Sequence, residues 1–185
     1  SEVEEVIRRL RELLRTLEEE NRKMIRENER LLEELKKRNE DIERELRKLV
    51  TELAKIADKT RDKDTLEKIL REIEREIDRL LDEIHKINRE IIKRSRDSLR
   101  EAHKRNKEIK ERIEKLLRDL EARITDEKLA RELREVAERI KKRLDEIDET
   151  TRRMVTESIK RLEEIDKRTT ERAREIKKEL RDRAT

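Results

Sequence analysis

Residues 10–56 read LRELLRTLEEENRKMIRENERLLEELKKRNEDIERELRKLVTELAKI. In this stretch an apolar or small polar side chain recurs every three or four residues, about 3.5 on average, and charged side chains fill the positions between. That spacing places the recurring residues on one face of an α-helix, as a stripe that extends from Val3 to Ile56. Because a helix with one apolar face buries it against other helices, the stretch predicts a helical bundle.

Two later segments, 66–120 and 129–180, carry the same stripe at about 3.6 residues per step. We therefore expect three helices of about 58 residues, at about 2–58, 65–124 and 126–183, each roughly 85 to 90 Å long. This period is close to that of a straight helix, so we expect little supercoiling.

The connections between the three segments are short, so neighbouring helices must run antiparallel. The predicted fold class is all-α. It is an up-down-up antiparallel three-helix bundle of long, nearly straight helices, and it forms a single domain over residues 1–185.

Polar residues mark the predicted start of the first two helices. Ser1 with Glu4, and Asp64 with Glu67, match the capping box in which a short polar side chain and a glutamate satisfy free backbone N–H groups. Between the two helices, residues 58–63 are wholly polar and are predicted to form the first loop.

The second break is predicted at residues 124–127, where Thr125 or Asp126 would cap the third helix. A competing break lies at residues 93–98, which are polar and are followed by a capping box that opens at Ser98. That break would divide the second helix into two shorter ones. The stripe crosses the segment without losing its phase, which favours one continuous helix.

The composition excludes several classes of function. The chain has 185 residues, of which 57% are charged and 31% are hydrophobic, and it contains no Gly, Pro, Cys, Phe, Trp or Tyr. Without cysteine there is no disulfide, thiolate nucleophile or thiolate metal site, and without glycine there is no phosphate-binding loop. Without aromatic rings there is no stacking surface for single-stranded nucleic acid. No apolar run is long enough to span a membrane or to form a targeting signal, so we expect a soluble protein.

The charge pattern points to a solvated helix surface. The net charge is +4, but it is the small difference between 55 basic and 51 acidic residues, and the two signs alternate closely along the chain. A nucleic-acid partner would require basic residues gathered on one face. A membrane partner would require a long apolar run or an aromatic belt, and the sequence has neither. We therefore expect neither partner.

Small polar residues interrupt the stripe in every segment. A buried polar side chain without a partner costs about 1 to 3 kcal/mol, so we expect these residues to pair across helices. The candidate network residues are Asn21, Asn28 and Asn39 in the first segment, His85, Asn88, Ser95, Ser98, His103 and Asn106 in the second, and Thr151, Ser158 and Thr169 in the third.

Turns near residues 61 and 125 would bring these residues to matched heights in three layers. The layers are Asn39 with His85, Thr169 and Thr170; Asn28 with Ser95, Ser98, Thr156 and Ser158; and Asn21 with His103, Thr150 and Thr151, while Asn106 faces Thr16. We predict three buried hydrogen-bond networks separated by layers of Leu and Ile. They would select one register, because a slipped register leaves buried amides unpaired.

The two histidines support no metal site or catalytic centre. His85 and His103 lie about 27 Å apart along one helix, too far to share a metal ion, and no cysteine is available to complete a ligand set. We expect no cofactor, no metal and no catalytic residue. If both histidines were buried and neutral, acid would destabilise the fold, so a pH-responsive switch is one alternative.

The chain resembles computationally designed helical bundles with buried hydrogen-bond networks. The likeness covers the whole chain and lies in helices of equal length, surfaces filled with Glu, Lys and Arg, cores of Leu and Ile, glycine-free loops, and Asn, Ser, Thr and His in layers. The resemblance implies a structural scaffold that is not an enzyme and has no evolved activity.

The narrow stripe leaves no second apolar face, so we expect a monomer that requires no partner. One alternative is a designed interaction module, in which the three helices form an open groove for a partner helix or a second copy. Another is a natural coiled-coil spacer, such as a spectrin-like repeat.

Overall fold

The computed structural model describes residues 2–184 and contains three α-helices. They are α1 (Glu2–Lys59), α2 (Lys63–Glu121) and α3 (Glu127–Ala184), and no strand occurs in this range. The predicted three-helix fold is confirmed. Helix α2 passes through residues 93–98 without interruption, so the competing break is wrong.

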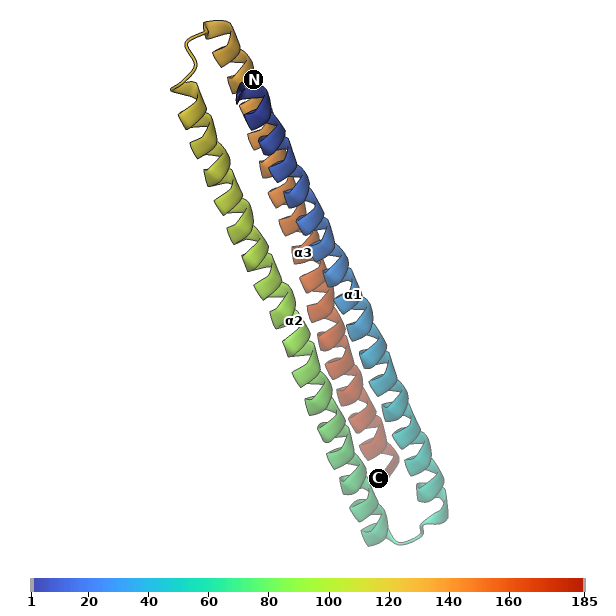
Figure 1. The fold of residues 1–185 in the computed structure, drawn as a ribbon. Helices are drawn as coiled ribbons and strands as arrows, with labels where there is room; N and C mark the ends of the chain where they lie inside the picture. Colours follow the sequence, from blue (N-terminus) through green and yellow to red (C-terminus); the bar gives the residue numbers. More distant parts are fainter. Residues whose placement is uncertain (1, 185) are drawn as a thin grey trace. The chain divides into compact units, whose positions relative to one another are not determined.

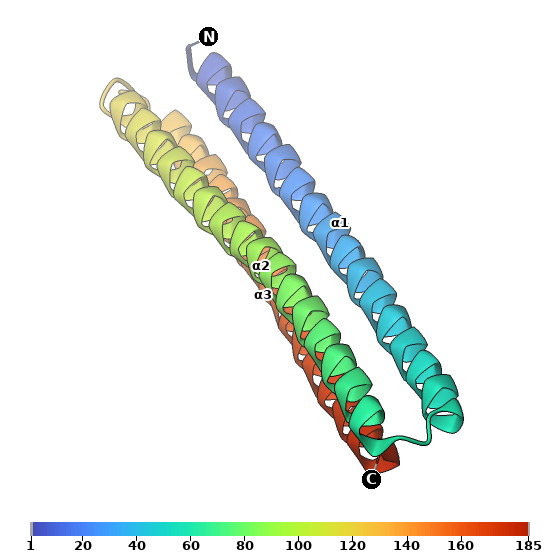
Figure 2. The same ribbon diagram turned by 90° about the horizontal axis from the view of Figure 1, so that it is seen from below.

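The chain divides into two compact units, and each contains a segment of every helix. The first unit holds the residues up to Glu29 together with Ser95–Glu157, and the second holds Arg30–Arg94 together with the residues from Ser158 onward. Within each unit the three segments lie side by side, and the α2 segment is antiparallel to the α1 and α3 segments (Figures 1 and 2). That residues 1–185 form a single domain stays a prediction.

Each unit has an apolar core to which all three helices contribute. In the first unit the core includes Leu10 and Leu17 of α1, Ile113, Leu117 and Leu120 of α2, and Leu133, Ala137, Ile140, Leu144 and Ile147 of α3. In the second unit it includes Leu46 and Leu53, Leu70, Ile77 and Leu80, and Ala173, Ile176 and Leu180. Each fully buried Leu or Ile contributes about 1.5 to 3 kcal/mol, so these cores are the main source of stability.

Two stripe residues are wrongly placed by the periodicity. Met154 and Ile56, which the stripe places in the core, are 39% and 37% exposed. In α3 the inward position belongs instead to Val155, which is 1% exposed. The spacing permits a step of either three or four residues after the buried Thr151, and both positions hold an apolar side chain. The β-branched valine takes the buried position, while the more flexible methionine lies at the surface.

Aspartates cap the second and third helices. The Asp62 carboxylate accepts from the Asp64 backbone N–H at 3.2 Å and from the Thr65 hydroxyl at 2.8 Å. These two bonds, of which that from Thr65 is the larger cause, lower the pKa of Asp62. The predicted capping box at Asp64 is therefore wrong, because Asp62 holds the N-cap position.

The other two predicted helix starts have different outcomes. Helix α3 is capped by Asp126, whose carboxylate accepts from the Lys128 backbone N–H at 3.0 Å. The sequence left Thr125 and Asp126 open, and the structure selects Asp126. The capping box of Ser1 lies outside the described residues.

Two polar networks as the candidate functional site

Asn39 on α1 is the centre of a buried network in the second unit. Its amide nitrogen donates to the Leu35 carbonyl oxygen at 2.7 Å and to Asn88 Oδ1 on α2 at 2.9 Å. Its Oδ1 accepts from the Asn88 amide at 3.1 Å and from the Thr169 hydroxyl on α3 at 2.9 Å. Because every hydrogen-bonding position of the buried Asn39 side chain is used, its burial costs little.

This network continues to the protein surface through Asp166 on α3. Its Oδ1 accepts from the Asn88 amide at 2.7 Å and lies 2.8 Å from His85 Nδ1 on α2. The other ring nitrogen, His85 Nε2, lies 3.0 Å from Thr170 Oγ1. The single proton of the Thr170 hydroxyl has a second acceptor in the Asp166 carbonyl oxygen, also at 3.0 Å. The side chains of His85 and Asp166 are 28% and 24% exposed, so this end of the network meets solvent.

A second network of the same kind occupies the first unit. Asn21 on α1 donates to the Leu17 carbonyl oxygen at 2.7 Å and to Asn106 Oδ1 on α2 at 3.1 Å, and it accepts from the Asn106 amide at 3.2 Å. Asn106 also donates to Asp148 Oδ1 on α3 at 2.9 Å. The buried amide pair and its carboxylate are thus repeated.

The outer end of this second network differs. His103 Nδ1 lies 3.2 Å from Asp148 Oδ2, and the same ring nitrogen lies 3.1 Å from an Arg152 guanidinium nitrogen. The His103 side chain is 50% exposed. Thr151 is buried in this unit, but among the described residues no hydrogen bond links it to Asn21.

One constellation of residue types, repeated at one spacing, makes both networks. The paired positions, each 18 residues apart, are Asn21 and Asn39 on α1, His85 and His103 and Asn88 and Asn106 on α2, and Asp148 and Asp166 and Thr151 and Thr169 on α3. Eighteen residues are about five turns, so both members of a pair lie on the same face of their helix.

Asp148 and Asp166 are absent from the residues predicted from the stripe, because an ionisable residue at the edge of a stripe is normally solvated. A signal for them exists in the sequence. Each lies three residues before a stripe threonine, Thr151 or Thr169, and each shares the 18-residue spacing of the asparagines.

The middle layer forms no comparable network. Asn28 donates to the Met24 carbonyl oxygen at 2.9 Å, but Asn28 Oδ1 and Ser95 Oγ are buried without a hydrogen-bond partner among the described residues. Ser98 and Ser158 are only half-buried. The predicted third network is therefore wrong, since a serine hydroxyl is too short to bridge helices unless its partner lies directly opposite.

The predicted pairing of Asn106 with Thr16 is wrong, because α1 and α2 pack in a different register from the one assumed. Asn106 pairs with Asn21 and does not face Thr16, whose exposed hydroxyl donates to the Glu12 carbonyl oxygen at 3.0 Å. The expected pairing assumed that α1 and α2 are arranged symmetrically about their loop. The actual pairing is displaced by about one turn, the displacement that brings two amides together.

The histidines do not meet the condition for the alternative function, a pH-responsive switch. That expectation required both rings to be buried and neutral. His103 is exposed, His85 is half-buried, and each ring has a carboxylate beside its Nδ1 atom.

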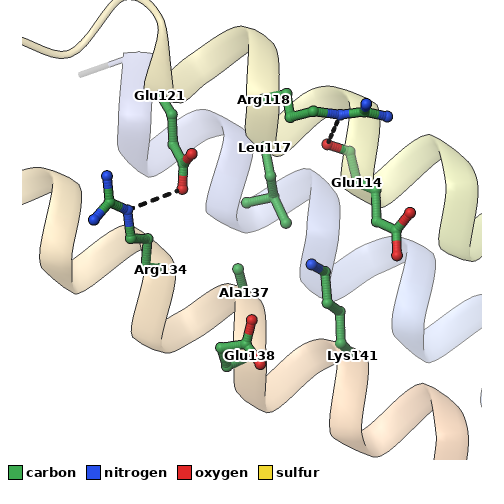
Figure 3. Close-up of a pocket in the computed structure, with 8 residues that line it drawn as sticks. All are labelled: Glu114, Leu117, Arg118, Glu121, Arg134, Ala137, Glu138 and Lys141. Atoms are coloured by element: carbon green, nitrogen blue, oxygen red, sulfur yellow. Dashed lines mark hydrogen bonds and ion pairs between the residues drawn. The ribbon is translucent and has the colours of Figure 1, made fainter.

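A shallow cavity of about 260 Å³ lies between α2 and α3 in the first unit. Leu117 and Ala137 form its apolar part, and Figure 3 shows charged side chains of both signs around them. The rim includes the ion pair of Arg134 with Glu121 at 3.4 Å. Leu117 of α2 and Ala137 of α3 face each other across it (Figure 3).

The helices offer neither a membrane span nor a metal site in the described part of the chain. Within residues 2–184, no helix combines the length and the apolar character needed to cross a bilayer. In the same range, His, Asp and Glu side chains do not gather in groups of three or more that would hold a metal ion.

Comparison with known proteins bears on the fold alone. No protein-family model matches the chain, and no curated protein sequence matches it. The chain is similar to a solved structure described as a computationally designed three helix bundle. The match covers 99% of this chain and 87% of the designed chain, with a TM-score of 0.63 and 18% sequence identity. This chain is thus similar in fold to a designed three-helix bundle.

Proposed function

We propose that the chain is a designed structural scaffold, a monomeric single domain without evolved biochemical activity whose two polar networks fix the register of the helices. The observation that carries this proposal is the repetition of one Asn–Asn–Asp–His constellation at a single 18-residue spacing on every helix. The fold likeness to a designed bundle supports it.

The networks suit a role in specificity better than a role in stability. Exchanging a protein–water hydrogen bond for an internal one contributes only about 0.5 to 1.5 kcal/mol, whereas leaving a buried amide unpaired costs about 1 to 3 kcal/mol. Sliding one helix by a turn would preserve much of the Leu and Ile packing, but it would separate Asn39 from Asn88 and Asn21 from Asn106. The penalty therefore falls on wrong registers.

This role can be tested by replacing the four paired asparagines, Asn21, Asn39, Asn88 and Asn106, with leucine. We expect the variant to stay helical by circular dichroism but to lose its single conformation, seen as broadened or multiplied amide signals in NMR spectra. Asn28→Leu combined with Ser95→Ala is the matched control, because it adds apolar groups to a layer that has no network. A four-leucine variant with spectra as sharp and single as those of the parent would contradict the proposal.

The monomeric, single-domain part has its own measurements. Light scattering should give a mass near the 22.8 kDa of one chain. Urea unfolding followed by circular dichroism should show one transition, since α1, α2 and α3 each run through residues of both units. A dimer mass or two separate transitions would contradict it.

A further inference from the structure

The second-unit network contains a hydroxyl, an imidazole and a carboxylate in sequence. Thr170 Oγ1 lies 3.0 Å from His85 Nε2, and His85 Nδ1 lies 2.8 Å from Asp166 Oδ1. This is the order in which hydrolases connect a nucleophile, a general base and an orienting acid. We propose that Thr170 is a nucleophile that attacks activated esters, with His85 as its general base and Asp166 as a positioning residue.

The contacts of Asp166 favour the tautomer of His85 that this role needs. A carboxylate accepts a hydrogen bond from Nδ1–H, which leaves the lone pair of Nε2 directed to Thr170. The carboxylate is itself held by the Asn88 amide at 2.7 Å, and Asn88 is held by Asn39. The ring orientation is therefore anchored in the buried part of the network.

The hydroxyl has two acceptors. Besides His85 Nε2, Thr170 lies 3.0 Å from the Asp166 carbonyl oxygen, a bond that helical threonines commonly make. The reactive arrangement is the one in which the proton is directed to Nε2. Solvent reaches this end of the network, because Thr170 is half-buried and the His85 side chain is 28% exposed.

The surroundings set the class of substrate. The backbone N–H groups near Thr170 are used within α3, which is continuous from Glu127 to Ala184, so the chain supplies no backbone oxyanion hole there. Esters of poor leaving groups and amides would remain unreactive. Small aryl esters such as p-nitrophenyl acetate need less oxyanion stabilisation, and they are the expected substrates.

The step is an acyl transfer. Thr170 Oγ bonds to the ester carbonyl carbon while its proton passes to His85 Nε2. The tetrahedral intermediate then expels p-nitrophenolate by breaking the bond between the acyl carbon and the aryl oxygen, and the proton on Nε2 passes to water. The product is an O-acetylated Thr170, which accumulates because nothing stabilises the oxyanion during hydrolysis.

The first unit provides a built-in comparison. At the position four residues after its aspartate it has Arg152 in place of Thr170, and the Arg152 guanidinium lies 3.1 Å from His103 Nδ1. This network therefore offers no hydroxyl to its histidine from that position.

The experiment exposes the full chain to p-nitrophenyl acetate and follows acetylation of each residue by peptide mass spectrometry. General-base assistance typically gives about 10²- to 10⁴-fold, so we expect Thr170 to be acetylated at least about 10-fold faster than the exposed Thr156 of the same molecule. His85→Asn and Asp166→Asn should reduce the Thr170 rate toward that of Thr156 without changing the Thr156 rate.

Two results would overturn the proposal. One is acetylation of Thr170 at the rate of Thr156 in the parent protein, which needs no variant to fold. A second is an unchanged Thr170 rate in a folded His85→Asn protein, as checked by circular dichroism.

Discussion

The networks of the two units use the same four residues, two asparagines, one aspartate and one histidine, at the same relative positions. At its outer end, however, the second-unit network is closed and the first-unit network is open. In the second unit Asn39 Oδ1 accepts from both Asn88 and Thr169, and both ring nitrogens of His85 have partners. In the first unit Asn21 Oδ1 accepts from Asn106, and His103 Nδ1 lies near both a carboxylate and a guanidinium.

The comparison shows that the residue four positions after each aspartate decides the outer end of a network. Thr170 is both a donor and an acceptor, so it can complete the hydrogen bonds of an imidazole in either protonation state. Arg152 is a donor only, and it lies beside the ring nitrogen that also faces Asp148. The same pair of buried asparagines can thus be combined with different residues, Thr170 or Arg152, at the solvent-facing end of the network.

The largest expected difference between the units comes from removing the asparagine on α1. Asn39→Leu removes the bonds that Asn88 and Thr169 make to Asn39, and Asn88 keeps only its bond to Asp166. The substitution should therefore lower the free energy of unfolding by about 2 to 4 kcal/mol. Asn21→Leu removes only the bonds to Asn106 and should cost about 1 to 2 kcal/mol. Urea denaturation of the two variants measures both. Equal costs would show that the closed network is no stronger than the open one.

A second prediction contrasts both networks with the layer that lacks one. Ser95 is buried without a partner, so Ser95→Ala removes an unsatisfied hydroxyl and should stabilise the fold by up to about 1 kcal/mol. Thr169→Ala removes a satisfied hydroxyl and should destabilise it by about 1 kcal/mol. The test is the sign of the shift in the urea midpoint. A loss of stability in Ser95→Ala would mean that its hydroxyl has a partner in solution.

Thr170 and Arg152, which lie at the solvent-facing ends of the two networks, can be compared by shortening or replacing each side chain. Thr170→Val keeps the shape of the side chain but loses its contacts with His85 and Asp166, so we expect a loss of about 0.5 to 1 kcal/mol. Arg152→Ala should change stability less, because exposed charge pairs contribute little. Thermal melting in low and high salt distinguishes the two, since only the Arg152 effect should depend on salt.

The smallest expected effect concerns the helix caps. Asp62 accepts two hydrogen bonds and Asp126 accepts one from a described residue, so Asp62→Ala should lower the melting temperature more than Asp126→Ala at neutral pH. The folded state lowers the pKa of Asp62, so its contribution is full above the unfolded value and is lost as pH falls through the lower folded value. The parent and the Asp62→Ala variant should therefore converge below about pH 3.8. A difference that does not shrink as the pH falls below about 3.8 would contradict this cause.

Sequence alone predicts much of this fold because the stripe is regular and nothing competes with it. The breaks follow from polar residues, and the asparagines of the stripe are buried as their positions require. Where two apolar residues are adjacent, the periodicity does not predict which of them is buried. Met154 and Val155 both fit the stripe, and only the packed helices decide between them.

The carboxylates of the networks are harder to predict. Asp148 and Asp166 are two of 51 acidic residues, and the 18-residue spacing that they share with the asparagines does not by itself show that they contact Asn106 and Asn88. The failed middle layer has a similar cause. Asn28 and Ser95 match the pattern of the other layers, but a hydrogen bond depends on a few tenths of an ångström, which a spacing of residues does not determine.

The 18-residue spacing also limits how such a bundle can be resized. Eighteen residues make about five full turns, so adding or removing one such block per helix leaves the rotation of the helix nearly unchanged. The apolar face beyond the block would then still face the core, and the polar face would still face solvent. A seven-residue block would turn the helix by about 20° relative to its neighbours, and repeated blocks would add up. Chains of this kind should therefore lengthen or shorten most cleanly in steps of five turns.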